Sequence, residues 1–253
     1  MKAAVIGLGW WGKVIVKNLA NSKRINVICG VDQDLSSLSD FGKEHKIELR
    51  DSYESVLEDQ DIDAVILATP NRLHHIHIIQ AAEAGKQIFC EKPLSLSSKD
   101  AKDAIEVCNK RGIFLGLGHE RRYESAMKSL FQHVRNGDIG NVLHVETNFS
   151  HDLFKTLDKD NWRFSPIDAP GGGFTARGIH LTDFMVHMFG RAKKVYSTMS
   201  SIAYEKPRID TMSANIEFLN GITGIVSVSI ANAPFSSISA IHFFKSFSFC
   251  IKT

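Results

Sequence analysis

The chain has 253 residues, a formal net charge of +2 at pH 7, 43% apolar residues and 23% charged residues. These values exclude disordered, collagen-like and coiled-coil chains. The charges are nearly balanced and form no basic block, which argues against nucleic acid as a partner. No apolar run reaches the roughly 18 residues that a membrane helix needs, so we expect no membrane partner either.

Four cysteines are spread along the chain without a C-x-x-C pair: Cys29, Cys90, Cys108 and Cys250. The apolar stretch at the N-terminus reaches glycines too early for a signal peptide. We therefore expect reduced, buried thiols rather than a disulfide or zinc framework, and a cytoplasmic location.

From residue 1 to about 118, short apolar runs alternate with amphipathic helical patterns. The predicted strands are Ala3–Ile6, Val27–Val31, Ala64–Ala68, Gln87–Cys90 and Ile113–Leu117. The predicted helices are Trp11–Ala20, Leu35–Glu44, Tyr53–Glu58, Leu73–Ala84 and Lys99–Lys110. Most of the strands are continuously apolar, as strands covered on both faces should be. This α/β alternation predicts a doubly wound, mostly parallel sheet in a first domain, residues 1–118.

After about residue 119 the pattern changes to helices and strands without regular alternation. The predicted helices are Glu124–Asn136 and Ile179–Phe189, and the predicted strands are Val142–Phe149, Lys194–Ser201, Thr211–Phe218 and Thr223–Ile230. Asn220 and Gly221 form a hairpin turn signal between the last two strands. Residues 119–253 therefore read as a second, α+β domain with an open, mainly antiparallel sheet.

The first predicted strand leads directly into a G-x-G-x-x-G pattern formed by Gly7, Gly9 and Gly12. In a dinucleotide site the first glycine allows a tight turn, the second lets the pyrophosphate approach the backbone, and the third lets the helix pack against the sheet. The N-terminus of that helix then offers free N–H groups to the phosphates. Trp10 and Trp11 fill the x positions, where they either cover the pyrophosphate or simply pack.

Asp32 ends the second predicted strand, 20 positions after Gly12. A carboxylate at this place accepts hydrogen bonds from the ribose hydroxyls and repels a 2′-phosphate. No Arg or Lys follows until Lys43, so the sequence favours NAD over NADP. The alternative is a solvated aspartate at the end of a strand.

Several later segments of the sequence are more specific than the glycine loop as signs of one protein family. They are Ala68-Thr69-Pro70-Asn71-Arg72-Leu73-His74, Ala84-Gly85-Lys86, Cys90-Glu91-Lys92-Pro93, Arg121-Arg122-Tyr123, Trp162-Arg163, Gly171-Gly172-Gly173 and Gly178-Ile179-His180-Leu181-Thr182-Asp183. With these segments the chain resembles the Gfo/Idh/MocA family of NAD(P)-dependent oxidoreductases over about residues 1–235. The resemblance implies a dinucleotide-binding domain, then an α/β domain with an open sheet that also builds a homo-oligomer.

The resemblance assigns catalysis to Lys92 and His180. An ammonium beside the reacting hydroxyl would stabilise the alkoxide that develops as the hydride leaves. Histidine suits proton removal because its ordinary pKa lies near neutrality. Asp183, one helical turn after His180, is expected to shape the same pocket.

The resemblance also distributes the remaining site residues. Those expected at the cofactor, in addition to the glycine loop and Asp32, are Thr69, Pro70, Asn71, His74 and Glu91, and Glu91 would alternatively orient the lysine. Those expected at the substrate are Lys92, Arg122, Trp162, Arg163 and Asp183.

Two alternatives stay open at His180. The ring would be a packed core histidine, or it would join Asp183 and His187 on one helical face as metal ligands. Because the family needs no metal, we expect no metal site. Many members place an aspartate four residues before the histidine, where this chain has Ala176. The neighbouring Arg177 either lies on the surface or offers a cation to an acidic substrate.

The predicted function is an NAD-dependent oxidoreductase that transfers a hydride between a sugar, cyclitol or related polyol hydroxyl and the nicotinamide. One alternative is a non-catalytic dinucleotide-binding protein. A second alternative is an NAD-dependent, glycoside-cleaving relative.

The end of the chain has an unusual composition. No Asp or Glu occurs from Phe218 to Thr253, and the last 19 residues hold 5 of the 16 phenylalanines. This predicts that the native reading frame is lost after about Ser236, which leaves a truncated sheet and an impaired oligomer. The alternative is a short natural member of the family with a Phe-rich last strand.

Overall fold

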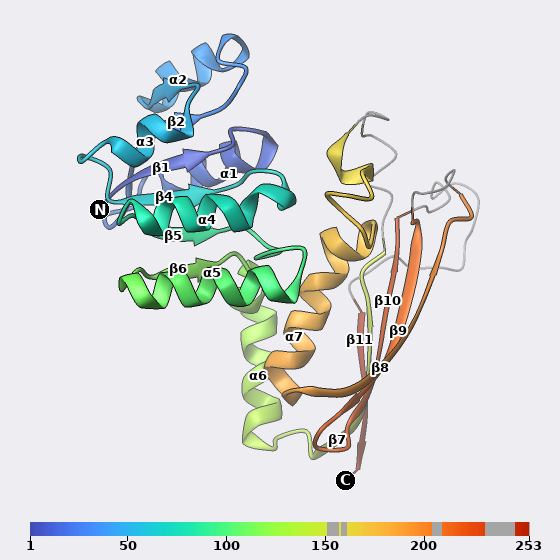
Figure 1. Ribbon diagram of the computed structural model, residues 1–253. Helices are drawn as coiled ribbons and strands as arrows, with labels where there is room; N and C mark the ends of the chain where they lie inside the picture. The colour runs from blue at the N-terminus through green and yellow to red at the C-terminus, as the bar shows by residue number, and fades with distance from the viewer. Residues whose placement is uncertain (151–156, 158–160, 204–208, 231–245, 253) are drawn as a thin grey trace. The chain divides into compact units, whose positions relative to one another are not determined.

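The computed structural model describes residues 1–150, 157, 161–203, 209–230 and 246–252 (Figure 1). The chain divides into two compact units, Met1–Gly118 and His119–Thr253. Each unit contains one sheet. Most of the segment in which the sequence predicts a lost reading frame lies outside the described residues.

The first unit contains a six-stranded sheet in which every pair of neighbours is parallel. Its strands are β1 (Lys2–Ile6), β2 (Asn26–Val31), β3 (Glu48–Arg50), β4 (Ala64–Leu67), β5 (Gln87–Cys90) and β6 (Leu115–Leu117). Their order is β3-β2-β1-β4-β5-β6, so the chain runs outward from β1 in one direction and then returns to continue in the other. This order confirms the predicted doubly wound fold.

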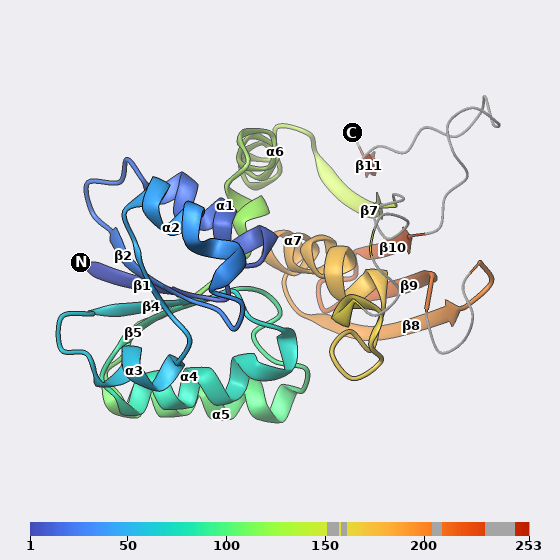
Figure 2. The ribbon, with the colours of Figure 1, turned by 90° about the horizontal axis from the view of Figure 1, so that it is seen from above.

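Helices cover both faces of this sheet. They are α1 (Trp10–Leu19), α2 (Ser39–His45), α3 (Tyr53–Glu58), α4 (His74–Glu83) and α5 (Ser98–Arg111). Figure 2 shows α1 and α2 on one face and α3, α4 and α5 on the other. The hydroxyl oxygens of Ser52 and Ser97 cap α3 and α5 by accepting backbone N–H bonds of 3.2 and 3.1 Å.

Three elements of the first unit differ from the sequence predictions. Strand β3 was not expected, because its three residues include the charged Glu48 and Arg50, which form an ion pair of 2.8 Å. The predicted helix at residues 35–44 is divided into a 3-10 turn, Ser36–Leu38, and α2. The last predicted strand begins two residues late, at Leu115.

The second unit contains a five-stranded sheet in the order β11-β7-β10-β9-β8. Its strands are β7 (Asn141–Asn148), β8 (Ala192–Ser200), β9 (Thr211–Phe218), β10 (Thr223–Ser229) and β11 (Ser246–Lys252). Only β7 and β10 pair in parallel, which confirms the predicted mainly antiparallel sheet. Strand β11, which pairs with β7, was not among the predicted strands.

Two helices, α6 (Ser125–Asn136) and α7 (Ile179–Phe189), pack against the sheet of the second unit (Figure 1). Burial alternates along β10, so that one side of the strand, including Val226 and Val228, faces the core with Met185 of α7. Edge strand β8 is exposed along almost its whole length. In the described part of the chain no helix is both long and apolar enough to span a membrane.

Lys86 is a buried cation that completes the hydrogen bonding at the end of α3. Its ammonium is 4% exposed and donates to the carbonyls of Asp59 at 2.6 Å and Ile62 at 2.8 Å. Among the described residues no other side chain donates to both carbonyls. The lysine therefore ties the turn before β4 to the turn before β5.

Replacement of this lysine tests the role of the buried cation in the first unit. Lys86→Met keeps the apolar stem but removes the donors, and it should lower the free energy of unfolding by about 2–4 kcal/mol because the carbonyls of Asp59 and Ile62 each lose a hydrogen bond from a charged donor. Urea unfolding followed by circular dichroism measures the change. Lys110→Met is the matched control, since Lys110 is exposed and pairs only with Glu106, and it should cost less than about 0.5 kcal/mol. Equal effects of the two variants would contradict this interpretation.

Candidate functional site

The glycine loop joins the end of β1 to the start of α1 with no room for a side chain at Gly7 or Gly12. Gly7 has a φ of +92°, and its N–H donates to the Val31 carbonyl at 2.8 Å. A Cβ atom at Gly12 would lie 1.9 Å from the Gly7 carbonyl oxygen. A Cβ atom at Gly9, by contrast, would meet nothing within 4 Å. The space above Gly9, at the N-terminus of α1, is therefore open to a ligand.

Asp32 is placed at this loop, as the sequence predicts for a residue that binds the ribose. Its Oδ2 accepts a 2.7 Å hydrogen bond from the Leu8 N–H, and the side chain is half-buried. The open backbone at Gly9, the helix N-terminus and this carboxylate fit a dinucleotide. In such a cofactor the phosphates would bind at α1 and the ribose at Asp32.

The two tryptophans of the loop differ in exposure. Trp10 is 72% exposed, and its ring lies 5.3 Å from that of Trp11, measured between centroids. The Trp11 indole nitrogen is buried and has no hydrogen-bond partner among the described residues. Trp10 therefore has surface available for a ligand, whereas Trp11 packs at the helix.

Four predicted site segments follow the carboxyl ends of neighbouring strands. Gly7 comes directly after β1, Asp32 after β2, and Glu91 after β5, while Thr69 lies two residues beyond the end of β4. The strands β2, β1, β4 and β5 are adjacent and parallel. Because ligands of open α/β sheets bind outside the carboxyl ends of the strands, the topology brings these segments to one edge of the sheet.

His74 holds two of these segments together. Its ring is 1% exposed, with Nδ1 at 2.6 Å from the Pro93 carbonyl oxygen and Nε2 at 2.9 Å from that of Thr69. Burial lowers the pKa of this histidine, although both carbonyl contacts act in the opposite direction. The ring therefore links the loops after β4 and β5. A place for His74 near the cofactor stays a prediction.

The segment after β5 is held tightly around Lys92. Glu91 is 7% exposed, and a Cβ atom at Gly118 would lie 2.8 Å from its Oε1, so the carboxylate packs against that glycine. The Lys92 N–H donates to Glu91 Oε2 at 3.3 Å. The Lys92–Pro93 peptide bond is cis. Lys92 is half-buried at this edge, and Asn71, in the loop after β4, is 7% exposed.

In the second unit His180 lies in the first turn of α7 and is 6% exposed. Its Nδ1 is 4.0 Å from Glu120 Oε2, and its ring meets the edge of His119 at 6.1 Å between centroids. Both neighbours come from the segment that contains the 3-10 turn Glu120–Tyr123 and the residue before it. Glu120 and His119 were not predicted as site residues, although they belong to a polar run at residues 119–123.

Arg122 and Asp183 were both expected to bind substrate. In the structure they form a bidentate ion pair with each other. Arg122 Nε donates to Asp183 Oδ2 at 2.6 Å, and a second guanidinium nitrogen donates to Oδ1. This bonding raises the pKa of Arg122. His119 Nε2 lies 3.6 Å from the same carboxylate. The pair fastens the 3-10 turn to α7 and so fixes the surroundings of His180.

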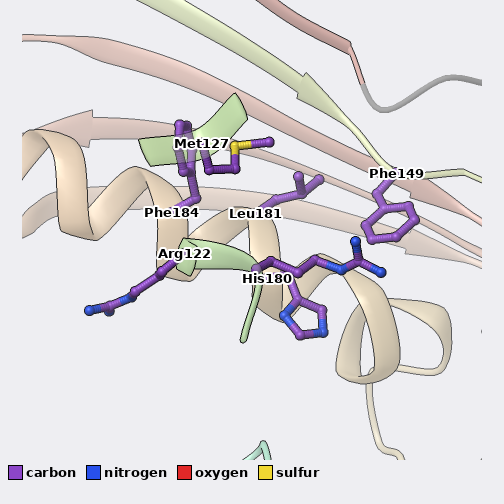
Figure 3. Close-up of a pocket in the computed structure, with 7 residues that line it drawn as sticks. Arg122, Met127, Phe149, His180, Leu181 and Phe184 are labelled. Carbon is purple, nitrogen blue, oxygen red and sulfur yellow. The ribbon is translucent and has the colours of Figure 1, made fainter. Parts of the chain in front are cut away.

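Figure 3 shows a pocket of the second unit with about 290 Å³ of empty space, open solvent included. Phe149 and His180 lie toward one end, and Met127 and Phe184 toward the other. Its lining consists of Arg121, Arg122, Met127, Phe149, His180, Leu181 and Phe184. Arg121 and Phe149 were not predicted. The pocket places the histidine between apolar side chains and arginines.

Trp162 and Arg163 belong to a separate 3-10 turn, Trp162–Phe164. The Arg163 guanidinium carbon lies 4.4 Å from the centre of the Trp162 ring. Both side chains are half-buried, and neither lines the pocket around His180. Their role in substrate binding stays a prediction.

The metal alternative at α7 has no support from geometry. In the part of the chain that the structure describes, no group of three or more His, Cys, Asp or Glu side chains is placed to hold a metal ion. Asp183 is engaged by Arg122, and the His187 ring stacks on Phe131 at 4.6 Å.

Alanine substitutions in the glycine loop separate folding from cofactor binding. Gly12→Ala should lower the free energy of unfolding by about 3 kcal/mol or more, because its Cβ collides with backbone. Gly9→Ala should change it by less than about 1 kcal/mol and weaken NAD binding by about tenfold or more, because its Cβ fills the open space. Urea unfolding and NAD titration by calorimetry measure the two effects. Unchanged NAD affinity in a folded Gly9→Ala variant would remove this loop from the site.

Two family models match the chain. The model of the oxidoreductase family with an NAD-binding Rossmann fold matches residues 1–119, and the model of the GFO/IDH/MocA C-terminal domain matches residues 127–242.

Individual relatives agree with these models. The scyllo-inositol 2-dehydrogenase (NAD(+)) of Bacillus subtilis (strain 168) is 38% identical over 237 residues, which cover 90% of this chain and 67% of that protein. The uncharacterized oxidoreductase YrbE of the same organism is 29% identical over 231 residues, covering 89% of this chain and 66% of that protein.

A solved structure shares the fold over most of the chain. GenD2 from gentamicin A biosynthesis, in complex with NAD, has a TM-score of 0.86 at 25% identity and covers 92% of this chain and 67% of its own. The chain thus spans about two thirds of the length of the proteins that it matches. It belongs to the Gfo/Idh/MocA family of oxidoreductases, and its residues 1–119 are an NAD-binding Rossmann domain.

Proposed function

We propose that the chain acts as an NAD-dependent dehydrogenase on a hydroxyl group of a sugar, cyclitol or related polyol. The observation that carries this proposal is that the glycine loop, Asp32 and Lys92 follow the carboxyl ends of β1, β2 and β5, which are parallel strands of one sheet. The family includes dehydrogenases that act on cyclitol hydroxyls, and a 38% identical relative is named for scyllo-inositol. Bound NAD would supply the hydride acceptor.

Lys92 is the proposed group at the reacting oxygen. Its two chain neighbours hold its backbone in place. The Glu91 carboxylate accepts a hydrogen bond from the Lys92 N–H, and the Pro93 carbonyl lies at hydrogen-bond distance from the His74 ring. A charged ammonium donates a hydrogen bond to the substrate hydroxyl and stabilises the negative charge that develops on the oxygen. Since this interaction strengthens only as charge develops, Lys92 should affect turnover more than binding.

His180 is the proposed proton acceptor. Glu120 lies 4.0 Å from its Nδ1, so a carboxylate is placed to stabilise the ring after it takes a proton. The Arg122–Asp183 ion pair holds the segment that carries Glu120 against α7. The ring is thereby kept in one orientation at the pocket.

Location and assembly remain proposals. Cys29, Cys90 and Cys108 are free and buried, in agreement with the expected reduced thiols. Burial raises the pKa of Cys29 to about 11, so this thiol stays protonated at neutral pH. We propose a cytoplasmic homo-oligomer, as the resemblance to the family suggests, and gel filtration with light scattering of the purified chain tests the assembly.

Loss of Lys92 tests the catalytic assignment. Lys92→Ala should lower kcat by about 100-fold or more while NAD affinity changes by less than about threefold, because the ammonium acts on the transition state. NAD reduction at 340 nm against a panel of polyols and sugar acids measures turnover, and calorimetry measures NAD binding. Lys99→Ala, at an exposed position on α5, is the control and should retain activity. If the native chain binds NAD but oxidises no member of the panel, the non-catalytic alternative replaces this proposal.

Loss of Asp32 tests the preference for NAD. Asp32→Ala removes the carboxylate that would bind the ribose hydroxyls, and it should weaken NAD binding by about tenfold while NADP binding stays equal or improves. Titration of the chain with both cofactors gives the ratio of the two dissociation constants. Asp40→Ala, at a fully exposed position on α2, should leave the ratio unchanged. An unchanged ratio in the Asp32 variant as well would place this residue outside the site.

A further inference from the structure

Three arginines of the second unit, Arg121, Arg163 and Arg177, are here called the arginine cluster, and Arg121 lines the pocket around His180. The guanidinium carbons of Arg121 and Arg177 lie 5.0 and 5.2 Å from the centre of the same Phe149 ring. The guanidinium carbon of Arg163 lies 4.4 Å from the centre of the Trp162 ring. All three arginines are half-buried, and aromatic faces rather than water cover part of each charge.

The charges within the cluster repel one another. Burial is the largest cause that lowers the pKa of Arg177, the positive charges of Arg121 and Arg163 lower it further, and the Glu120 carboxylate acts in the opposite direction. Burial alone lowers the pKa of Arg163. Three like charges in a partly desolvated region are unfavourable unless an anion lies among them.

The protein compensates this charge only in part. Arg121 pairs with Glu124 at 2.6 Å and lies 3.7 Å from Glu120. Within the described residues, neither Arg163 nor Arg177 has a carboxylate at ion-pair distance. Each of these two guanidinium groups instead lies over an aromatic ring.

The cluster adjoins the proposed proton acceptor. Arg121 and Phe149 line the pocket together with His180, and the Phe149 ring, which also contacts Arg177, lies near the histidine in Figure 3. Arg177 is three residues before His180, in the π-helical turn Phe174–Gly178 that leads into α7. An anion held by the cluster would therefore lie close to a substrate that His180 serves.

We propose that the arginine cluster binds an anionic group of the substrate, so that the substrate is an acidic polyol, such as a sugar acid, rather than a neutral one. Guanidinium groups bind carboxylate and phosphate with two parallel hydrogen bonds, and stacking on an aromatic ring pre-orients them for this contact. The inference rests on the proposed function for its choice of site, and it specifies the chemical class of the substrate.

The test compares matched sugars that share one ring and differ in the group at C6. The probes are the uronate, the 6-phosphate and the parent hexose of the gluco, galacto and manno series, titrated into the full chain with saturating NAD and followed by calorimetry. At least one anionic probe should bind about tenfold tighter than its parent hexose, and the difference should shrink as salt is raised. Tighter uronate or phosphate binding identifies the type of anion. If no anionic probe binds more tightly than its parent hexose, the proposal is wrong.

Single substitutions then locate the preference. Arg177→Gln and Arg163→Gln should each reduce the preference for the anion to about twofold or less, and Arg177→Lys should retain part of it because the charge remains. Arg135→Gln, at an exposed position on α6, is the matched control and should keep the full preference. Thermal unfolding verifies that each variant is folded. A preference that survives in folded forms of both glutamine variants overturns the proposal.

The same probes keep this inference separate from the proposed dehydrogenase activity. Lys92→Ala should abolish NAD reduction yet retain the anion preference, because Lys92 acts on the reacting hydroxyl and not on the anionic group. Anion preference without turnover in the native chain would contradict the proposed function alone. Turnover of neutral polyols without anion preference would contradict this inference alone.

Discussion

In the first unit the start of α1 lies so close to the end of β1 that no side chain fits between the two backbones. Because a Cβ atom at Gly12 would lie 1.9 Å from the Gly7 oxygen, α1 can begin this close to the end of β1 only without side chains there. The close approach directs the free N–H groups of the helix toward the open space at Gly9. It also brings the Leu8 N–H to Asp32, so the end of β2 is tied to the same loop. The position of α1 and the candidate cofactor site therefore share one steric cause.

The sequence predicts those elements whose burial repeats along the chain. Continuous apolar runs predict β1, β2, β4 and β5 to within about one residue, since helices cover both faces of these strands. Strand β3 has no such run, because two of its three residues are charged and ion-paired. Residues 246–249 alternate Ser and Phe, which is a strand pattern, but the composition of the segment suggested a lost reading frame instead. β11 was missed for that reason.

Only those parts of the candidate site whose residues belong to one short sequence motif could be predicted. The glycine loop and Asp32 follow from spacing along one βαβ unit. By contrast, the environment of His180 is assembled from residues about 60 positions earlier in the chain, and only the packing of the 3-10 turn against α7 shows that Glu120 lies beside it. Arg122 and Asp183 were both singled out from the sequence, but their bond to each other depends on the same packing. His74 links the loops after β4 and β5, and no sequence motif predicts this link.

The single parallel pair in the second sheet has a consequence for synthesis on the ribosome. Strand β7 pairs with β10 through partners such as His144 and Thr223, which are 79 residues apart, and with β11 further on. At about 5–20 residues per second, β7 emerges roughly 4–16 s before its first sheet neighbour is made. The first unit has all its strands by residue 117 and is able to fold during that interval. Throughout it, both hydrogen-bonding edges of β7 are unpaired in the nascent chain, so this strand is open to pairing with other chains until β10 is made.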